Sequence, residues 1–215
     1  MNKKIKDELK TFWEQLTFSY NGERGLIDQY WGELCDYYLQ PRRHYHNLAH
    51  IQSLVKLIEK YQAHILNPQA LFFAAFYHDI IYDVTRSDNE IKSAELAEKR
   101  LKELHVDKQA AALAADIIRH TARHKKTGNF DIDLFLDFDR SILSASPEEY
   151  QQYAALVRKE FDIFSDNIYT SARAKMIAQY LEAPEIYYTA VMKVHEQAAR
   201  RNLQNELENL NSTPD

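Results

Sequence analysis

The chain has few of the residues that interrupt helices. Its 215 residues include only 4 glycines and 5 prolines, and apolar residues recur every three or four positions along most of the sequence. Because this spacing places apolar side chains on one face of a helix, the pattern predicts an all-α helical bundle. A chain of this length can bury a sizeable core without cross-links, so a single domain over residues 1–215 is expected.

Other scarcities exclude whole classes of protein. A single cysteine, Cys35, rules out an intramolecular disulfide and suits a reducing compartment. Charges of both signs are interspersed, with a net charge of -5, which argues against an extended nucleic-acid-binding surface. No apolar run approaches the length of a membrane span, and the polar first residues do not have the character of a secretory signal. We therefore expect a cytoplasmic protein that binds small partners and no membrane.

Turn and capping residues divide the chain into expected helices. A hairpin of two helices up to residue 40 is expected, separated by residues 21–25. A helix capped by Asn47, with Leu48, Ile51, Leu54, Val55 and Ile58 inward, should then run until Asn67 and Pro68. The next expected helix starts at a capping box in residues 87–90 and places Ile91, Ala94, Leu101 and Leu104 inward. It is followed by a helix over residues 106–121 and one over 134–143 that is capped by Asp133. A further helix starts at Ser146 and Pro147, and the last covers residues 186–210.

The most informative feature is a histidine followed by an aspartate inside an apolar run. His78 and Asp79 lie in this run, which is expected to form a buried helix. Buried polar side chains need partners, because leaving them unpaired in a core is costly. His50 and one of two later aspartates, Asp137 and Asp139, are suited to complete a divalent-metal site with this pair. Such a mixed ligand set suits Mn, Fe, Co, Ni, Zn or Mg without choosing among them.

Three other histidines each allow two interpretations. His46 shares a helical face with His50 if the helix extends that far, or it only orients a neighbour through its ring nitrogens. His120 and His124, also four residues apart, are either ligands of a second ion or solvated residues at a helix end.

At these positions the chain resembles the HD superfamily of metal-dependent phosphohydrolases, whose pattern is a histidine, a His-Asp pair and a distant aspartate on a bundle of helices. The matching residues are His50, His78, Asp79 and Asp139. The chain is most similar to a predicted phosphohydrolase family of this superfamily, marked by the motif Arg-His-Tyr-His-Asn-x-x-His, which residues 43–50 reproduce. Further matching segments are residues 78–83, 89–94, 121–124, 137–139 and 199–206.

One departure from the family pattern bears on the metal ligands. The family has Asp-Ala-Asp-Leu where this chain has Asp137, Phe138, Asp139 and Arg140. The resemblance implies that Asp139 is the last ligand, while Arg140 either pairs with Asp137 or touches a substrate phosphate. In relatives with two metal ions, a histidine corresponding to His120 binds the second ion, so the resemblance implies one or two ions.

The residues and the resemblance together predict a hydrolase. A divalent ion with open positions lowers the pKa of bound water, and the expected target is phosphorus in a nucleotide or a related small metabolite. Candidate catalytic residues are Asp79, His46, His120 and His124, and candidate substrate contacts are Arg42, Arg43, Lys125, Arg140 and Asp137. Two alternatives stay open: a di-iron oxygenase of the HD type, and a non-catalytic nucleotide-sensing module that depends on metal.

Overall fold

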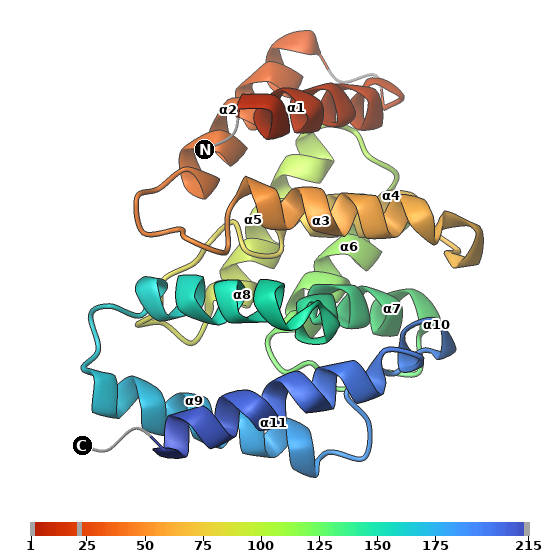
Figure 1. Cartoon of the computed structure of the whole chain (residues 1–215). Coiled ribbons are helices and arrows are strands. Elements are labelled where there is room, and N and C mark those ends of the chain that lie inside the picture. Colours follow the sequence, from red (N-terminus) through yellow and green to blue (C-terminus); the bar gives the residue numbers. More distant parts are fainter. Residues whose placement is uncertain (1–2, 21–22, 213–215) are drawn as a thin grey trace. The chain divides into compact units, whose positions relative to one another are not determined.

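A computed structural model of the protein describes residues 3–20 and 23–212. Every regular element within these ranges is a helix, which confirms the all-α prediction (Figure 1). The chain divides into two compact units, one ending at Leu136 and the other starting at Asp137. This boundary falls inside the helix Phe130–Asp139, which runs through it without a break. The single-domain expectation stays a prediction.

The first unit contains α1 (Lys3–Phe18), α2 (Arg24–Tyr38), α3 (Leu48–Lys60), the short 3-10 helix η1 (Gln62–His64), α4 (Pro68–Tyr77), α5 (Asn89–Glu103), α6 (Lys108–Thr121) and most of α7 (Phe130–Asp139). Helix α4 packs against α3, α5 and α6, and α1 packs against α2 and α3. Every residue of α4 from Ala70 to Tyr77 is buried. A helix that is apolar on all sides belongs inside a core, and α4 is the central element of this unit.

The aromatic side chains of α4 tie it to the first helix. The indole ring of Trp13 on α1 lies 6.3 Å from the ring of Phe73, 5.2 Å from that of Phe76 and 6.1 Å from that of Tyr77. These are edge-to-face arrangements, which aromatic pairs favour. The end of α4, which the His-Asp pair follows, is therefore anchored in the core by Trp13.

Two asparagines start helices in this unit. Asn47 caps α3 as predicted, because its side chain accepts a hydrogen bond from the Ala49 N–H at 2.8 Å. All five residues predicted on the inner face of this helix are buried. The prediction that Asn67 and Pro68 end α3 is wrong. The Asn67 side chain accepts from the Ala70 N–H at 3.1 Å and begins α4, with Pro68 at the first position, where its missing N–H costs nothing.

The starts of α2 and α5 differ from the expected ones. Residues 21 and 22 of the predicted separator lie outside the described residues, and α2 already begins at Arg24. Helix α5 follows Asp88 without a side-chain cap, so the predicted capping box is wrong. Ala94, Leu101 and Leu104 are buried as predicted, whereas Ile91 is 49% exposed. The buried face of α5 is centred on Ser93, Ala94, Ala97 and Leu101, and Ile91 lies off that face.

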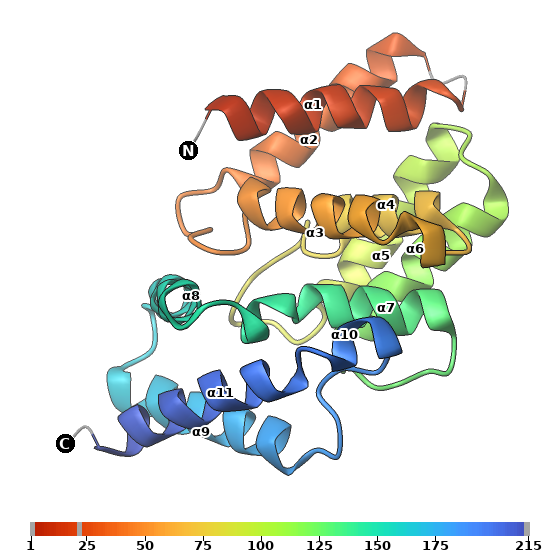
Figure 2. The same cartoon turned by 45° about the vertical axis from the view of Figure 1, so that its right-hand side comes forward.

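The second unit contains the end of α7, the 3-10 helix η2 (Ser141–Ser144), α8 (Pro147–Glu160), α9 (Asp166–Glu182), the short α10 (Ala190–Lys193) and α11 (Glu196–Ser212). Helix α11 packs against α9 and η2, and the pairing of α9 with α11 is visible in Figures 1 and 2. The helix start predicted at Ser146 and Pro147 is confirmed, and Glu149 completes a capping box with Ser146.

Two helix boundaries around the second unit were predicted wrongly. Helix α7 runs from Phe130 to Asp139 instead of over residues 134–143. Asp133 therefore lies inside the helix and does not cap it. Instead the Asp133 carboxylate accepts from the N–H groups of Thr127 and Gly128 in the preceding loop, at 2.7 and 3.0 Å. The predicted tail helix over residues 186–210 begins only at Glu196. The Glu196 carboxylate accepts from the N–H groups of Ile186 and Tyr187, and these hydrogen bonds hold the segment before α11 close to its first turn.

The polar residues of the tail motif hold the second unit together. Arg200 donates to the carbonyl groups of Leu181 and Ala183 at the end of α9, at 2.9 and 2.8 Å. Asn202 donates to two carbonyl groups at the end of η2, both at 2.9 Å. Glu206 accepts two hydrogen bonds from the buried guanidinium of Arg173. This part of the motif therefore has a structural role.

No described helix combines the length and the apolar character needed to cross a membrane.

Candidate metal centre

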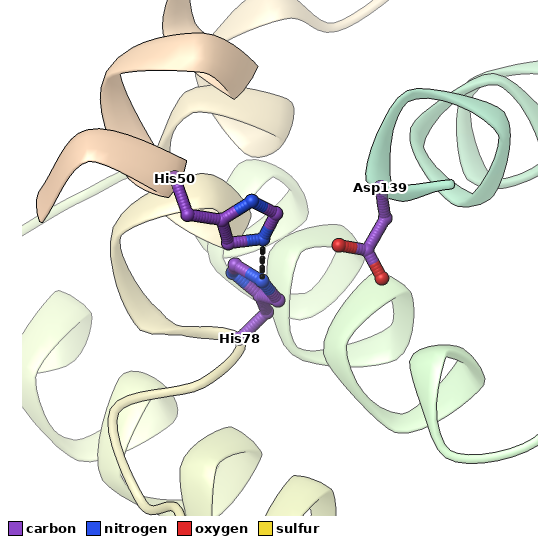
Figure 3. Close-up of side chains that lie close together, drawn as sticks. All are labelled: His50, His78 and Asp139. Carbon is purple, nitrogen blue, oxygen red and sulfur yellow. Dashed lines mark hydrogen bonds between the residues drawn. The ribbon is translucent and has the colours of Figure 1, made fainter. Parts of the chain in front are cut away.

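Three ligand atoms of the first unit converge on one point. His50 Nε2 lies 3.1 Å from His78 Nε2, the contact that is dashed in Figure 3. Asp79 Oδ2 lies 2.9 Å from His78 Nε2 and 3.9 Å from His50 Nε2. Ligands at about 2.0–2.2 Å from a divalent ion are separated from one another by roughly 3–3.6 Å, so these three atoms can bind one ion with small adjustments.

The packing of two helices brings these residues together. His50 lies in the first turn of α3, whose start is fixed by the Asn47 cap. His78 and Asp79 follow the last residue of α4, and α3 packs against α4. The prediction that this pair lies within a helix is wrong: α4 ends at Tyr77, His78 is its C-cap and Asp79 lies in the following turn. The carbonyl groups of Asp79 and Ile80 accept hydrogen bonds from Arg43 instead of continuing the helix. The periodicity of the sequence does not predict such tertiary hydrogen bonds.

The hydrogen bonds of His78 fix which nitrogen faces the cluster. Its Nδ1 lies 3.1 Å from the carbonyl oxygen of Ala75. Because a carbonyl group can only accept, this contact assigns a proton to Nδ1, and in the neutral imidazole the Nε2 lone pair then faces His50 and Asp79. The imidazole is 1% exposed, and its ring packs edge-on against Phe135 on α7, with centroids 5.8 Å apart. Its tautomer and orientation are thus fixed by the fold, as in protein metal sites.

This set of atoms fits a divalent ion. The Nε2 lone pair of His78 and the carboxylate of Asp79 are both hydrogen-bond acceptors, and two acceptors 2.9 Å apart repel each other unless a proton or a cation lies between them. The two imidazoles are 6% and 1% exposed, and the Asp79 side chain is 17% exposed. A nearly buried set of two imidazoles and one carboxylate, open on the carboxylate side, is typical of a site for a transition metal or Mg.

Asp137 has a structural role in the second unit. It is fully buried; its Oδ1 accepts from the Tyr188 N–H at 2.8 Å and from the Arg140 guanidinium at 3.3 Å. Its Oδ2 accepts from the N–H and the hydroxyl of Thr189 at 2.8 and 2.7 Å. Burial raises the pKa of Asp137, although these four donors act in the opposite direction. With both oxygens engaged by protein donors, this carboxylate is poorly suited to bind a metal ion or a substrate.

Asp139 is the last residue of α7 and the third side chain labelled in Figure 3. It is half-buried, in contrast to Asp137 two positions earlier. Residues four apart share a face of a helix, so Asp139 lies one turn beyond Phe135, whose ring contacts His78.

His46 lies next to one of the candidate ligands. Helix α3 begins at Leu48, so His46 and His50 do not share a helical face, but their ring centroids are 5.8 Å apart. The imidazole of His46 also lies over the ring of Tyr82, with centroids 4.5 Å apart. This position suits both predicted roles, a proton donor and a residue that orients His50.

Two of the four cationic residues predicted to contact substrate are engaged within the protein. Arg43 is buried and donates to backbone carbonyl groups. Arg140 is buried, pairs with Asp137 and lies over the ring of Tyr188, 4.5 Å from its centroid. Arg42 and Lys125 are exposed. For all four residues, substrate contact stays a prediction.

His120 and His124 lie on either side of the end of α6, which was expected near Thr121. Helix α6 ends at Thr121, so His120 and His124 do not share a helical face. His124 has a left-handed backbone (φ 44°), and its N–H donates to the carbonyl group of His120 at 3.0 Å. The side chain of His120 is 40% exposed, with Nε2 3.8 Å from a carboxylate oxygen of Asp116. Their roles as catalytic residues or ligands of a second ion stay predictions.

Two residues with positional roles were missed at the level of sequence. Ser93 Oγ accepts from the Ile81 N–H at 3.1 Å, and Asn89 Oδ1 accepts from the Asp83 N–H at 3.2 Å. Ser93 also donates to the carbonyl group of Ile81, and Asn89 donates to that of Asp83. They therefore hold the segment that follows Asp79. Their presence in the motif of residues 89–94 was the available signal, but the sequence alone gave no partner for them.

Comparisons of the chain with family models, with curated proteins and with solved structures found no match.

Proposed function

We propose that the protein is a divalent-metal-dependent phosphohydrolase of the HD type, acting on a nucleotide or another small phosphorylated metabolite. The observation that carries this proposal is the convergence of His50 Nε2, His78 Nε2 and Asp79 Oδ2 within 2.9–3.9 Å. Asp139 is the proposed fourth ligand. Support for it comes from its match to the distant aspartate of the family pattern and from its place on α7, one turn after Phe135.

The proposed chemistry is hydrolysis by an activated water. A bound divalent ion would supply a nucleophile near neutral pH and charge stabilisation for a phosphoryl group. His50 and His78 would hold the ion as neutral imidazoles, and the contact of His78 Nδ1 with the Ala75 carbonyl would favour the required tautomer of His78. The neighbouring His46 is the proposed general acid, which would protonate the leaving oxygen.

The reaction class is tested with a panel of nucleotides and phosphorylated metabolites. We expect release of inorganic phosphate or pyrophosphate from at least one compound in the presence of Mn, Co, Ni or Mg, and its loss when a chelator is added. Oxygen uptake is followed in parallel after loading with iron. Iron-dependent oxygen consumption without phosphate release would support the oxygenase alternative. Tight nucleotide binding without turnover in either assay would support the sensing module.

The role of His46 is tested separately from metal binding. His46→Ala should retain the metal and lose rate by about 10²–10⁴-fold, which is the usual contribution of a general acid or base. The matched control is His44→Ala, in the same loop, for which we expect a rate close to that of the wild type. Metal content and rate are measured on the same preparations. Wild-type rate in His46→Ala would remove this residue from the proposed mechanism.

A further inference from the structure

Arg43 is a buried cation whose partners are backbone carbonyl groups and aromatic rings. Arg43 is 7% exposed. Its Nη1 donates to the carbonyl oxygens of Asp79 and His46, at 2.5 and 3.2 Å. The other terminal nitrogen, Nη2, donates to the carbonyl oxygen of Ile80 at 2.7 Å. The guanidinium carbon lies 4.8 Å from the ring centroid of Tyr38 and 5.2 Å from that of Tyr82.

These contacts join the two segments that carry the candidate ligands. The His46 carbonyl belongs to the loop that leads directly into the first turn of α3, where His50 lies. The Asp79 and Ile80 carbonyls belong to the turn after α4. One rigid guanidinium therefore sets the distance between the loop before one histidine and the turn that carries the candidate carboxylate ligand. Its planar fork suits this task, since it can donate to several acceptors in a fixed geometry.

The turn after α4 has no regular secondary structure, and side chains hold its backbone instead. Arg43 binds its first two carbonyl groups, Ser93 binds both backbone groups of Ile81, and Asn89 binds both backbone groups of Asp83. The peptide between residues 79 and 80 is thus fixed on the Arg43 side, and this restricts the direction of the Asp79 side chain. The Asp79 carboxylate then lies 2.9 Å from His78 Nε2.

Burial of a guanidinium is costly unless acceptors and aromatic faces compensate for its lost hydration. The Nε of Arg43 has no hydrogen-bond partner within the described residues, so this compensation is incomplete. An apolar residue would fill the space between Tyr38 and Tyr82 without that cost. The cation is better explained by what it fixes, namely three carbonyl groups next to the candidate ligands.

We infer that Arg43 is a positioning residue that keeps Asp79 in ligand geometry, and that metal affinity depends on it without contact between Arg43 and either the ion or the substrate. This inference rests on the proposed function, because it requires the metal site. It replaces the expectation that Arg43 binds a substrate phosphate, since both of its terminal nitrogens are engaged with carbonyl groups in the described structure.

The test is a Co²⁺ titration of the full-length apoprotein, followed by the visible absorption of the bound ion and by thermal unfolding. Arg43→Lys should weaken Co²⁺ binding by roughly 10–100-fold, the usual effect of losing a residue that orients a metal ligand, and should change the absorption spectrum. Lysine keeps the charge but replaces the two terminal nitrogens of the planar fork, both of which Arg43 uses, with one flexible ammonium group. The control is Arg42→Ala, an exposed neighbour, which should bind like the wild type.

A second variant keeps the inference testable whatever the stability of the first. Ser93→Ala removes one hydroxyl from the other side of the same turn and should weaken Co²⁺ binding in the same direction by a smaller factor. If Arg43→Lys does not fold, Ser93→Ala decides. Wild-type affinity and spectrum in the folded variants, with only the melting temperature of the apoprotein lowered, would show that the role of Arg43 is structural and overturn the inference.

The same titration separates this inference from the proposed function. Loss of Co²⁺ binding in His78→Ala, together with wild-type binding in Arg43→Lys and Ser93→Ala, would refute only the positioning role. Failure of the wild-type protein to bind Co²⁺, or equal binding by His78→Ala, would refute the metal site itself and the positioning role with it.

Discussion

Replacing His78 with alanine should abolish metal binding and the stabilisation that metal gives to the protein. His78 Nε2 is the central atom of the cluster, 3.1 Å from His50 Nε2 and 2.9 Å from Asp79 Oδ2. Without it the two remaining atoms are 3.9 Å apart and one of the anchoring imidazoles is lost. At a free metal concentration of 100 times Kd, the wild type should gain about 2.7 kcal/mol of unfolding free energy, and the variant close to none.

Metal content and thermal unfolding measured on the same preparations check this prediction. His50→Ala and Asp79→Ala should fail in the same way, because each removes one of the converging atoms. The control is His64→Ala, an exposed histidine in η1, which should bind metal like the wild type. Circular dichroism establishes that the helices remain. Full metal occupancy in all three ligand variants would refute the assignment of the site.

The candidate ligands His78 and Asp79 could be found from the sequence because their signal is local. A histidine and an aspartate in an apolar run must have partners, and this holds whatever the fold. Their place relative to the end of α4 could not be found in this way. The helix ends at Tyr77, and the carbonyl groups of Asp79 and Ile80 are bound by Arg43, a residue far away in sequence. The competition between helical and tertiary hydrogen bonds has no periodic signature.

The same limit explains the errors at helix ends. Asn67 and Pro68 together are compatible with the end of one helix or the start of the next, and in the structure Asn67 caps the start of α4. The late start of α11 depends on backbone N–H groups being bound by the Glu196 carboxylate. The start of α8 at Ser146 and Pro147 was predicted correctly, because an N-cap serine followed by a proline is a signal contained in adjacent residues.

Asp137 and Asp139 could not be distinguished at the level of sequence, since both are carboxylates two positions apart on one helix. The difference between them depends on residues about fifty positions later. Tyr188 and Thr189 supply three of the four donors that engage Asp137, while Asp139 is half-buried at the helix end. Long-range hydrogen bonds of this kind give Asp137 a structural role, and nothing in the local sequence around the two aspartates reports them.

Substituting each of these aspartates by asparagine should therefore produce opposite defects. Asp139→Asn should retain the fold and weaken metal binding by more than the roughly 10–100-fold that loss of an orienting residue costs, because a charged ligand is lost. Asp137→Asn should retain the metal and unfold more easily. The amide keeps one acceptor oxygen and turns an NH₂ group toward protein donors, and each buried donor left without a partner costs about 1–3 kcal/mol.

Both substitutions nearly preserve side-chain volume, so the comparison isolates charge and hydrogen bonding. Metal content, the metal-dependent rise in melting temperature and the melting temperature of the apoprotein are measured for the pair. The expected pattern is a low metal content with a near-normal apoprotein for Asp139→Asn, and a normal metal content with a less stable apoprotein for Asp137→Asn. The reverse pattern would exchange the two roles, and would mean that the donors around Asp137 rearrange when the ion binds.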